Sequence, residues 1–169
     1  QEDPWQTVSA SAEAFGNGFH IPAALDEPGM TRVRNAFAQA AQRASRIGFD
    51  AIELHGAHGY LLHQFISPIS NHRNDEFGGS FDHRMRFPLS VIKAVREVVP
   101  AKIALGIRMT GTDWFEGGLG ASDAVAQARA FKQAGMDFAC VSGGGSRPDV
   151  KVALGPGYQV PFAEAVKKE

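Results

Sequence analysis

Two short stretches of the sequence share a pattern that restricts the fold to α/β classes with parallel strands. Ile47-Gly-Phe-Asp50 and Ala134-Gly-Met-Asp137 each place a helix-ending glycine before an aspartate at the entrance to an apolar run. A third apolar run, Lys102–Arg108, lies between them. Helices that alternate with buried strands in this way build a parallel barrel or an open α/β sheet.

Apolar residues at helical spacing predict four helices. The first ends at Gly48 and has one apolar face, formed by Val33, Phe37, Ala40, Ala44 and Ile47. The second spans residues 81–98, where Pro88 predicts either a late start or a kink. The third has Ser122 as its N-cap, and its predicted inner face comprises Val125, Ala128 and Phe131. A terminal helix is predicted over about 161–168.

Three buried strands are predicted, over Phe49–Leu54, Lys102–Arg108 and Asp137–Ser142. Residues 1–30 are predicted to be an ordered loop region rather than a linker. The reason is the need to bury four large apolar side chains, those of Trp5, Phe15, Phe19 and Ile21. Residues 31–169 then hold about three βα units, and residues 1–169 form a single domain.

The number of strands is too small for a complete barrel. An eight-stranded (βα)₈ barrel needs at least about 200 residues, whereas this chain has 169. Three parallel strands also leave two unpaired sheet edges. We therefore predict the central part of a TIM barrel, with its active site at the C-terminal face, completed by further barrel segments or by a complementing chain. The alternative is a small, complete three-layer α/β domain.

Composition excludes several functional classes. The formal net charge is −1, with acidic and basic residues mixed along the chain, so nucleic acid is a poor candidate partner. No apolar run approaches the roughly 20 residues of a membrane helix. The start of the chain, Gln1-Glu-Asp-Pro4, is not a secretory signal. The single cysteine, Cys140, allows no intrachain disulfide and fits a reducing cytoplasm.

The motif His55-Gly-Ala-His58-Gly-Tyr60 directly follows the first predicted strand. Its glycines let the turn pass close to a ligand. The two imidazoles can donate hydrogen bonds to a carbonyl oxygen or bind a metal, and Tyr60 could deliver a proton. Two alternatives remain: a histidine that caps backbone groups, and a metal site formed by His55, His58 and His63.

The run from His55 to Ser80 resembles the hallmark of the old yellow enzyme family of NADH:flavin oxidoreductases. Two histidines and the run Ser70-Asn-His-Arg73 are similar to the thermophilic-like class. Arg84-Met-Arg-Phe87 and Gly106-Ile-Arg108 extend the resemblance.

The resemblance implies a (βα)₈ barrel that holds non-covalent FMN at its C-terminal mouth. The implied reaction is the NAD(P)H-dependent reduction of activated C=C bonds in α,β-unsaturated carbonyl compounds. His55 and His58 would bind the substrate oxygen, Tyr60 would protonate the carbon, and Arg108 would lie against the flavin. A homo-oligomer is implied for the complete enzyme.

The strands that would hold most of the flavin are missing from this stretch, so the chain alone is expected to bind FMN weakly or not at all. Two other functions stay open. One is a non-catalytic, small-ligand-binding α/β domain. The other is a metal-dependent lyase or hydrolase on a TIM barrel.

Three predictions concern residues near the motif. Arg73 and Asp75 are expected to pair and to hold the long loop in place. Cys140 is expected to lie in the core, because alanine and valine flank it in a predicted strand. Trp114 and Phe115 either line the barrel mouth or anchor their loop.

Overall fold

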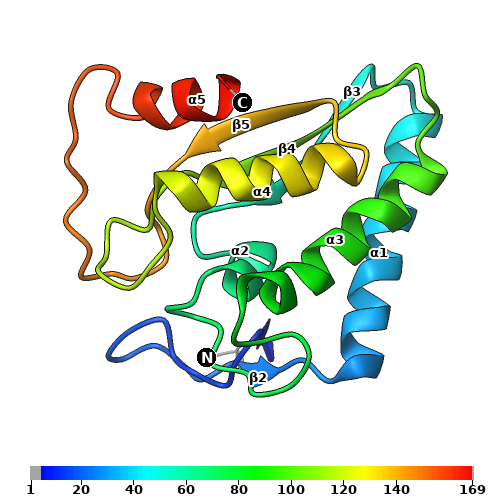
Figure 1. Cartoon of the computed structure of the whole chain (residues 1–169). Coiled ribbons are helices and arrows are strands. Elements are labelled where there is room, and N and C mark those ends of the chain that lie inside the picture. The colour runs from blue at the N-terminus through cyan, green and yellow to red at the C-terminus, as the bar shows by residue number, and fades with distance from the viewer. Residues whose placement is uncertain (1–4, 169) are drawn as a thin grey trace.

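A computed structural model describes residues 5–168, and Figure 1 shows its helices arranged around one parallel sheet. In chain order the elements are β1 (Val8–Ser9), β2 (Ala23–Ala24), α1 (Glu27–Arg46), β3 (Ala51–Gly56), α2 (Leu61–Ile66), α3 (Phe81–Val98), β4 (Ala104–Thr110), α4 (Ala121–Gln133), β5 (Phe138–Ser142) and α5 (Val160–Lys167). The stretch Gln1–Pro4 lies outside the described residues. Within them, no helix has the length and apolar character needed to cross a membrane.

The main sheet has the order β3-β4-β5, and both of its pairings are parallel. The α/β class with parallel strands is therefore confirmed. The pairing aligns His55 with Arg108 and Arg108 with Cys140, so the three residues form one row across the sheet. β4 lies in the middle, and β3 and β5 form the two edges.

The two faces of the sheet differ, because successive side chains of a strand point to opposite sides. Leu105, Ile107 and Met109 of β4 are fully buried in the hydrophobic core with the helices. The other side, here called the open face, carries the alternate residues, and several of them remain exposed or half-exposed. They include Glu53, His55, Arg108, Phe138 and Cys140.

The core lies between this sheet and the helices. α1 and α2 both pack against α3, and the largest fully buried side chains include Phe65, Phe87, Phe131, Leu62 and Ile92. α3 begins at Phe81, where Ser80 accepts a hydrogen bond from the backbone N–H of His83, and continues through Pro88. The predicted helix over 81–98 is confirmed, without the late start that Pro88 allowed.

The N-terminal segment departs from the prediction in two respects. First, α1 begins at Glu27, inside the predicted loop region, because Asp26 accepts the N–H of Gly29 at 2.8 Å and Pro28 occupies the first turn. Second, the expected burial is wrong: the exposed fractions are 86% for Trp5 and 66% for Ile21. The segment is instead ordered by backbone pairing of β1 with β2.

The edge strands are less buried than predicted. β3 spans Ala51–Gly56 rather than Phe49–Leu54, and Phe49 is 57% exposed. In β5, Phe138 and Ala139 are exposed. Each of the two strands has a neighbouring strand on one side only, so part of its apolar surface stays exposed in the described part of the chain.

The N-terminal cap of α4 also differs from the prediction. The helix begins at Ala121, and the carboxylate of Asp123 accepts the N–H of Gly120 at 2.8 Å. Ser122 therefore lies inside the first turn and is not the cap. The residues buried on this helix are Ala124, Gln127 and Phe131, whereas Val125 and Ala128 line a groove beside β5 and α5.

Candidate functional site

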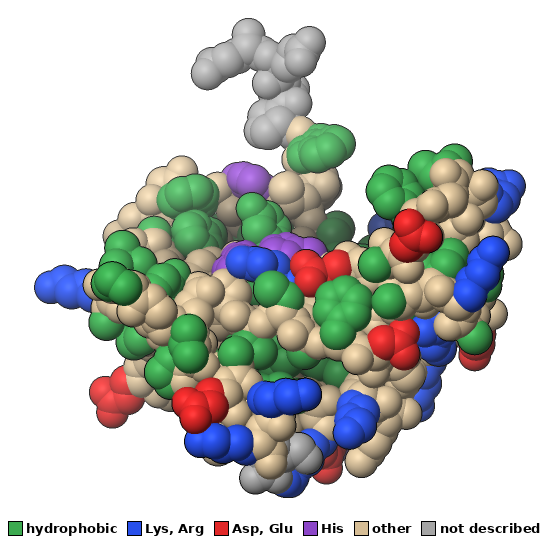
Figure 2. All heavy atoms as spheres, turned by 90° about the horizontal axis from the view of Figure 1, so that it is seen from above, with side chains coloured by type: hydrophobic (Ala, Val, Ile, Leu, Met, Phe, Trp, Pro, Cys, Tyr) green, Lys and Arg blue, Asp and Glu red, His purple; other side chains and the backbone are tan. Residues whose placement is uncertain are grey.

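The C-terminal ends of the three strands bring the predicted site residues together. His55 comes from β3, and Arg108, its register partner, comes from β4. Figure 2 shows histidine side chains grouped near the middle of the face seen from above, next to basic and acidic side chains and among apolar ones. The chemistry-bearing residues thus lie at the edge of the sheet where parallel α/β folds place active sites.

His55, His58 and Tyr60 form a cluster of rings. The ring centroid of His55 lies 5.1 Å from that of His58 and 5.2 Å from that of Tyr60. Burial and then the positive charge of Arg108 lower the pKa of both histidines. Both imidazoles are therefore neutral at pH 7, and each offers one N–H donor. Tyr60 is 64% exposed, so its hydroxyl is accessible to a ligand.

The turn at His58 is held in a left-handed conformation. His58 has φ 58° and Gly59 has φ 73°. A Cβ added at Gly59 would lie 2.2 Å from the carbonyl oxygen of Gly145, and one at Gly145 would lie 2.7 Å from Cα of His58. The close approach of two backbone segments therefore requires glycine at positions 59 and 145. The approach to a ligand that the sequence predicts for Gly56 and Gly59 stays a prediction.

Arg108 donates from Nη1 to the Cys140 sulfur at 3.2 Å and from Nη2 to the Ser142 hydroxyl at 3.4 Å. Within residues 5–168, no carboxylate forms an ion pair with it. The prediction that Cys140 is a core residue is wrong. Strand alternation places Cys140 on the open face in register with Arg108.

Sequence analysis missed Ser142 and Gln159. The Ser142 hydroxyl lies 2.7 Å from Nε2 of His58 and 3.0 Å from Nε2 of Gln159, and only 1% of the residue is exposed. The single usable signal was strand alternation, which puts Ser142 on the same face as Cys140. Nothing in the sequence indicated Gln159, which precedes α5.

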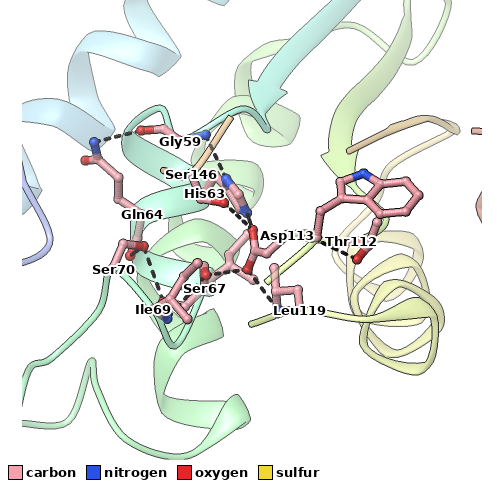
Figure 3. Close-up of polar contacts among 12 residues, drawn as sticks. Gly59, His63, Gln64, Ser67, Ile69, Ser70, Thr112, Asp113, Leu119 and Ser146 are labelled. Carbon is pink, nitrogen blue, oxygen red and sulfur yellow. Dashed lines mark hydrogen bonds and ion pairs between the residues drawn. The ribbon is translucent and has the colours of Figure 1, made fainter. Parts of the chain in front are cut away.

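A second polar cluster lies beneath the turn (Figure 3). Nδ1 of His63 accepts the backbone N–H of Gly59 at 2.8 Å, and Nε2 lies 3.1 Å from Oδ1 of Asp113. Both side chains are completely buried. His63 therefore connects the turn to the loop that follows β4.

Asp113 is the centre of this cluster. Its carboxylate accepts the hydroxyls of Ser67 at 2.6 Å and Ser146 at 2.7 Å, and the N–H of Leu119 at 2.8 Å. Burial raises the pKa of Asp113, but His63, the Leu119 amide and the Ser67 hydroxyl outweigh burial and lower it to about 2. The carboxylate is therefore charged at neutral pH and joins α2, the loop before α4 and the segment after β5.

The metal alternative loses its third ligand. Both ring nitrogens of His63 face protein groups, so His63 cannot share an ion with His55 and His58. Across the part of the chain that the structure describes, no group of three or more histidine, cysteine, aspartate or glutamate side chains could hold a metal ion.

A cleft of about 480 Å³ opens between the N-terminal segment and the turn. His58 and Tyr60 line one side, and Phe15, Phe19 and His20 line the other. The rings of Phe15 and Phe19 pack edge to face, with 5.2 Å between their centroids. The two phenylalanines that were expected to be buried thus border a cleft that His58 also lines.

The surrounding loops are tied down by specific contacts. Arg73 pairs with Asp75, as predicted, and also donates to the carbonyls of Ala10 at 2.9 Å and Leu25 at 2.7 Å. Trp114 packs edge to face on Phe162 of α5, with 5.7 Å between centroids. Trp114 therefore anchors its loop.

Phe115 lies under the Arg147 guanidinium, whose carbon is 4.5 Å from the ring centroid. Arg147 in turn borders the cleft. Phe115 thus does not line the cleft itself but contacts a residue that does.

The sequence matches a known protein family over most of its length. The profile of the NADH:flavin oxidoreductase / NADH oxidase family matches residues 2–149. The chain belongs to this family. Members of the NADH:flavin oxidoreductase family bind FMN and use NAD(P)H.

Curated relatives in the NADH:flavin oxidoreductase family share about 40% sequence identity with this chain. An NADH:flavin oxidoreductase of Gibberella zeae is 40% identical over 178 residues, covering 98% of this chain and 43% of the relative. An NADPH dehydrogenase of Geobacillus sp. is 41% identical over 164 residues, covering 97% and 47%. The chain thus spans a little less than half the length of the curated relatives it matches.

Solved structures give the same result for the fold. Morphinone reductase superposes with a TM-score of 0.75 at 29% identity, covering 99% of this chain and 49% of the reductase. A 2-naphthoyl-CoA reductase has a TM-score of 0.87 at 24% identity, covering 96% and 26%. These neighbours are TIM barrels, so they confirm the prediction that the chain is part of such a barrel. The alternative of a small, complete three-layer domain is thereby wrong.

Proposed function

We propose that this chain forms the substrate-binding part of an FMN-dependent ene-reductase. The reaction is the reduction of activated C=C bonds in α,β-unsaturated carbonyl compounds with NAD(P)H. The observation that carries the proposal is the cluster of two neutral imidazoles and one exposed phenol beside Arg108 on the open face. Residues 1–169 then form one part of a single barrel domain. The single cysteine fits a cytoplasmic setting.

His55 and His58 bind the carbonyl oxygen of the substrate. Each neutral ring donates one N–H, and two converging donors polarise the conjugated system. Negative charge grows on this oxygen as hydride reaches the β-carbon, so the two hydrogen bonds strengthen in the transition state. The low pKa of both histidines supports this role, because a neutral pair avoids repulsion between two imidazolium ions.

Tyr60 delivers the proton to the α-carbon. A phenol is protonated at neutral pH and can therefore act as a general acid. Its ring packs on His55, and the residue lines the cleft. A substrate held by the histidines would lie within reach of this hydroxyl.

Arg108 fits a flavin ring. Its guanidinium is half-exposed on the open face, and its contacts are with a sulfur and a hydroxyl rather than with a carboxylate. The remaining positive charge suits the electron-rich edge of FMN. When bound, FMN supplies the hydride.

The test uses a chimeric barrel. The matched 164-residue segment of the Geobacillus NADPH dehydrogenase is replaced by this chain, and the product is loaded with FMN. Phenol affinity is measured through the charge-transfer band, and flavin reoxidation by cyclohexenone is measured by stopped flow. The unmodified dehydrogenase serves as the reference.

Replacing His55 and His58 by alanine removes two hydrogen bonds to a phenolate. The expected loss is about 3 kcal/mol, or roughly 100-fold in phenol affinity, with FMN retained. Tyr60→Phe should slow reoxidation by enone about 100-fold or more while NADPH reduces the flavin at an unchanged rate. His83→Ala, on α3, is the matched control. Unchanged phenol affinity in the double variant would refute the proposed role of the histidines.

A further inference from the structure

The Ser142 hydroxyl occupies a fixed place behind His58, at the buried end of β5. We propose that Ser142 is a positioning residue that holds His58 in the tautomer with its proton on Nδ1, so that Nδ1–H is the donor presented to the substrate. The part of this statement that concerns substrate rests on the proposed function. The tautomer itself follows from which neighbours of the Ser142 hydroxyl donate hydrogen bonds and which accept them.

Two of the three neighbours of the Ser142 oxygen are donors. Gln159 approaches with its amide nitrogen at 3.0 Å, and Arg108 approaches with Nη2 at 3.4 Å. A guanidinium has no acceptor, and an amide nitrogen has none either. The Gln159 amide also donates to the Tyr158 hydroxyl at 2.8 Å, so both of its hydrogens are used.

The third neighbour must therefore accept. A hydroxyl has two lone pairs and one hydrogen. Gln159 and Arg108 occupy both lone pairs, which leaves the hydrogen for the 2.7 Å contact with Nε2 of His58. Nε2 accepts this hydrogen and carries no proton of its own. An imidazolium would bring a third donor to the same oxygen, for which no lone pair is left.

The free side of His58 then carries the proton. Among the described residues, Nδ1 of His58 has no hydrogen-bond partner, and His58 lines the cleft. The left-handed turn and its contact with Gly145 fix the backbone at the same residue. The ring is thus held at its backbone and at Nε2, and only Nδ1–H faces the place for a ligand.

The surroundings favour the same protonation state. Burial and Arg108 lower the pKa of His58, which removes the imidazolium at neutral pH. Ser142 is almost fully buried, so water does not compete for its hydrogen. Its hydroxyl therefore selects between the two neutral forms, which otherwise exchange freely in an imidazole.

The decisive measurement is made on the whole 169-residue chain without flavin or ligand. Histidine is labelled with ¹⁵N, and long-range ¹H–¹⁵N correlation spectra are recorded at neutral pH. The His58→Asn variant assigns the ring. We expect a pyrrole-type Nδ1 and a pyridine-type Nε2 for His58. A pyrrole-type Nε2 in the unmodified chain would overturn the proposal without need of any Ser142 variant.

Variants then test whether Ser142 is the cause. Ser142→Ala should lose the fixed pattern, with Nε2 shifting toward the pyrrole-type position as the two tautomers exchange. Ser142→Thr, which keeps the hydroxyl, should restore the original pattern. Ser90→Ala, an equivalent change on α3, should leave His58 unchanged. If the Ser142→Ala variant gives the same spectrum as the unmodified chain, Ser142 does not select the tautomer.

This result and the ene-reductase proposal fail separately. The tautomer is read from the ring nitrogens and needs no substrate, whereas the proposed function depends on phenol affinity and reoxidation rate in the chimeric barrel. In that barrel, Ser142→Ala should weaken phenol binding about tenfold, the equivalent of one weakened hydrogen bond, with FMN retained. Unchanged phenol affinity would contradict the claim that His58 Nδ1–H is the donor to the substrate. It would leave the assignment of the tautomer intact.

Discussion

Asp113 and His63 are two ionisable side chains without exposed surface, 3.1 Å apart. A buried charge is tolerated only when hydrogen bonds replace its lost hydration. Asp113 has such partners in two hydroxyls and one amide. The cluster also supports the turn, because His63 accepts the N–H of Gly59.

Replacing Asp113 with asparagine should therefore be costly. Asparagine has the size of aspartate, but it replaces one accepting oxygen by an NH₂ group. That NH₂ group would face one of the donors whose hydrogen bonds the Asp113 carboxylate accepts. Leaving a buried donor without an acceptor in this way costs about 1–3 kcal/mol. Urea unfolding followed by circular dichroism measures the loss. Asp149→Asn, at an exposed pair with Arg147, is the control and should leave the midpoint in place.

The same residue predicts how stability depends on pH. The pKa of Asp113 is about 2 in the folded chain against an ordinary value of 3.8. A depressed carboxyl pKa stabilises the fold above pH 3.8, and this contribution disappears as the pH falls from 3.8 towards 2. The loss is about 2 kcal/mol. The free energy of unfolding, measured across this range, should fall less steeply in Asp113→Asn. Equal slopes would contradict the assignment.

At the scale of single residues, the sequence was informative where one local motif carried the chemistry. His55 lies at the end of β3, and His58 and Tyr60 lie in the turn that follows it. The structure brings their three rings together, whereas the roles assigned to them stay predictions. Ser142 was missed because it lies 84 positions from His58, its hydrogen-bond partner. Asp113 was missed for the same reason, since Ser67 is 46 positions away. Contacts over such separations depend on strand order, which no local pattern specifies.

At the scale of elements, the turn after β3 depends on the segment after β5. Gly59→Ala should destabilise the chain for two separate reasons. The left-handed φ costs an alanine about 1–2 kcal/mol, and the contact with the Gly145 oxygen adds about 1–3 kcal/mol of overpacking. Gly117→Ala is the matched control, because Gly117 has φ 77° with open space around it. Thermal unfolding of both variants measures the difference, and equal destabilisation would mean that the backbone contact is unimportant.

Element types were predictable, and their ends were less so. Apolar spacing gave α1 and α3, and Gly48 and Gly135 marked helix ends. The start of α1 was placed too late, although Asp26 and Pro28 form a recognisable cap and first turn. The apolar repeat begins only at Val33, so the first turn carries no periodic signal. Strand burial was overestimated, because a central strand and an edge strand have similar composition.

At the scale of the whole molecule, the open face leaves a cofactor largely uncovered. Binding pockets bury about 70–90% of a ligand of this size, whereas the described part of the chain offers Arg108 on one exposed sheet face. We expect the 169-residue chain to lose FMN during gel filtration, measured by absorbance at flavin wavelengths. The chimeric barrel should retain it. Flavin that co-elutes stoichiometrically with the chain alone would contradict this expectation.

The packing of Trp114 on α5 has a practical consequence for optical spectroscopy. The chain has two tryptophans; Trp5 is 86% exposed, and Trp114 is packed edge to face on Phe162. Their emission should separate under acrylamide, which quenches the exposed indole first. In a Trp5→Phe background the remaining fluorescence reports the surroundings of Trp114, where the loop after β4 meets Tyr158 and the α5 residue Phe162. The same signal would follow assembly when other barrel segments are added.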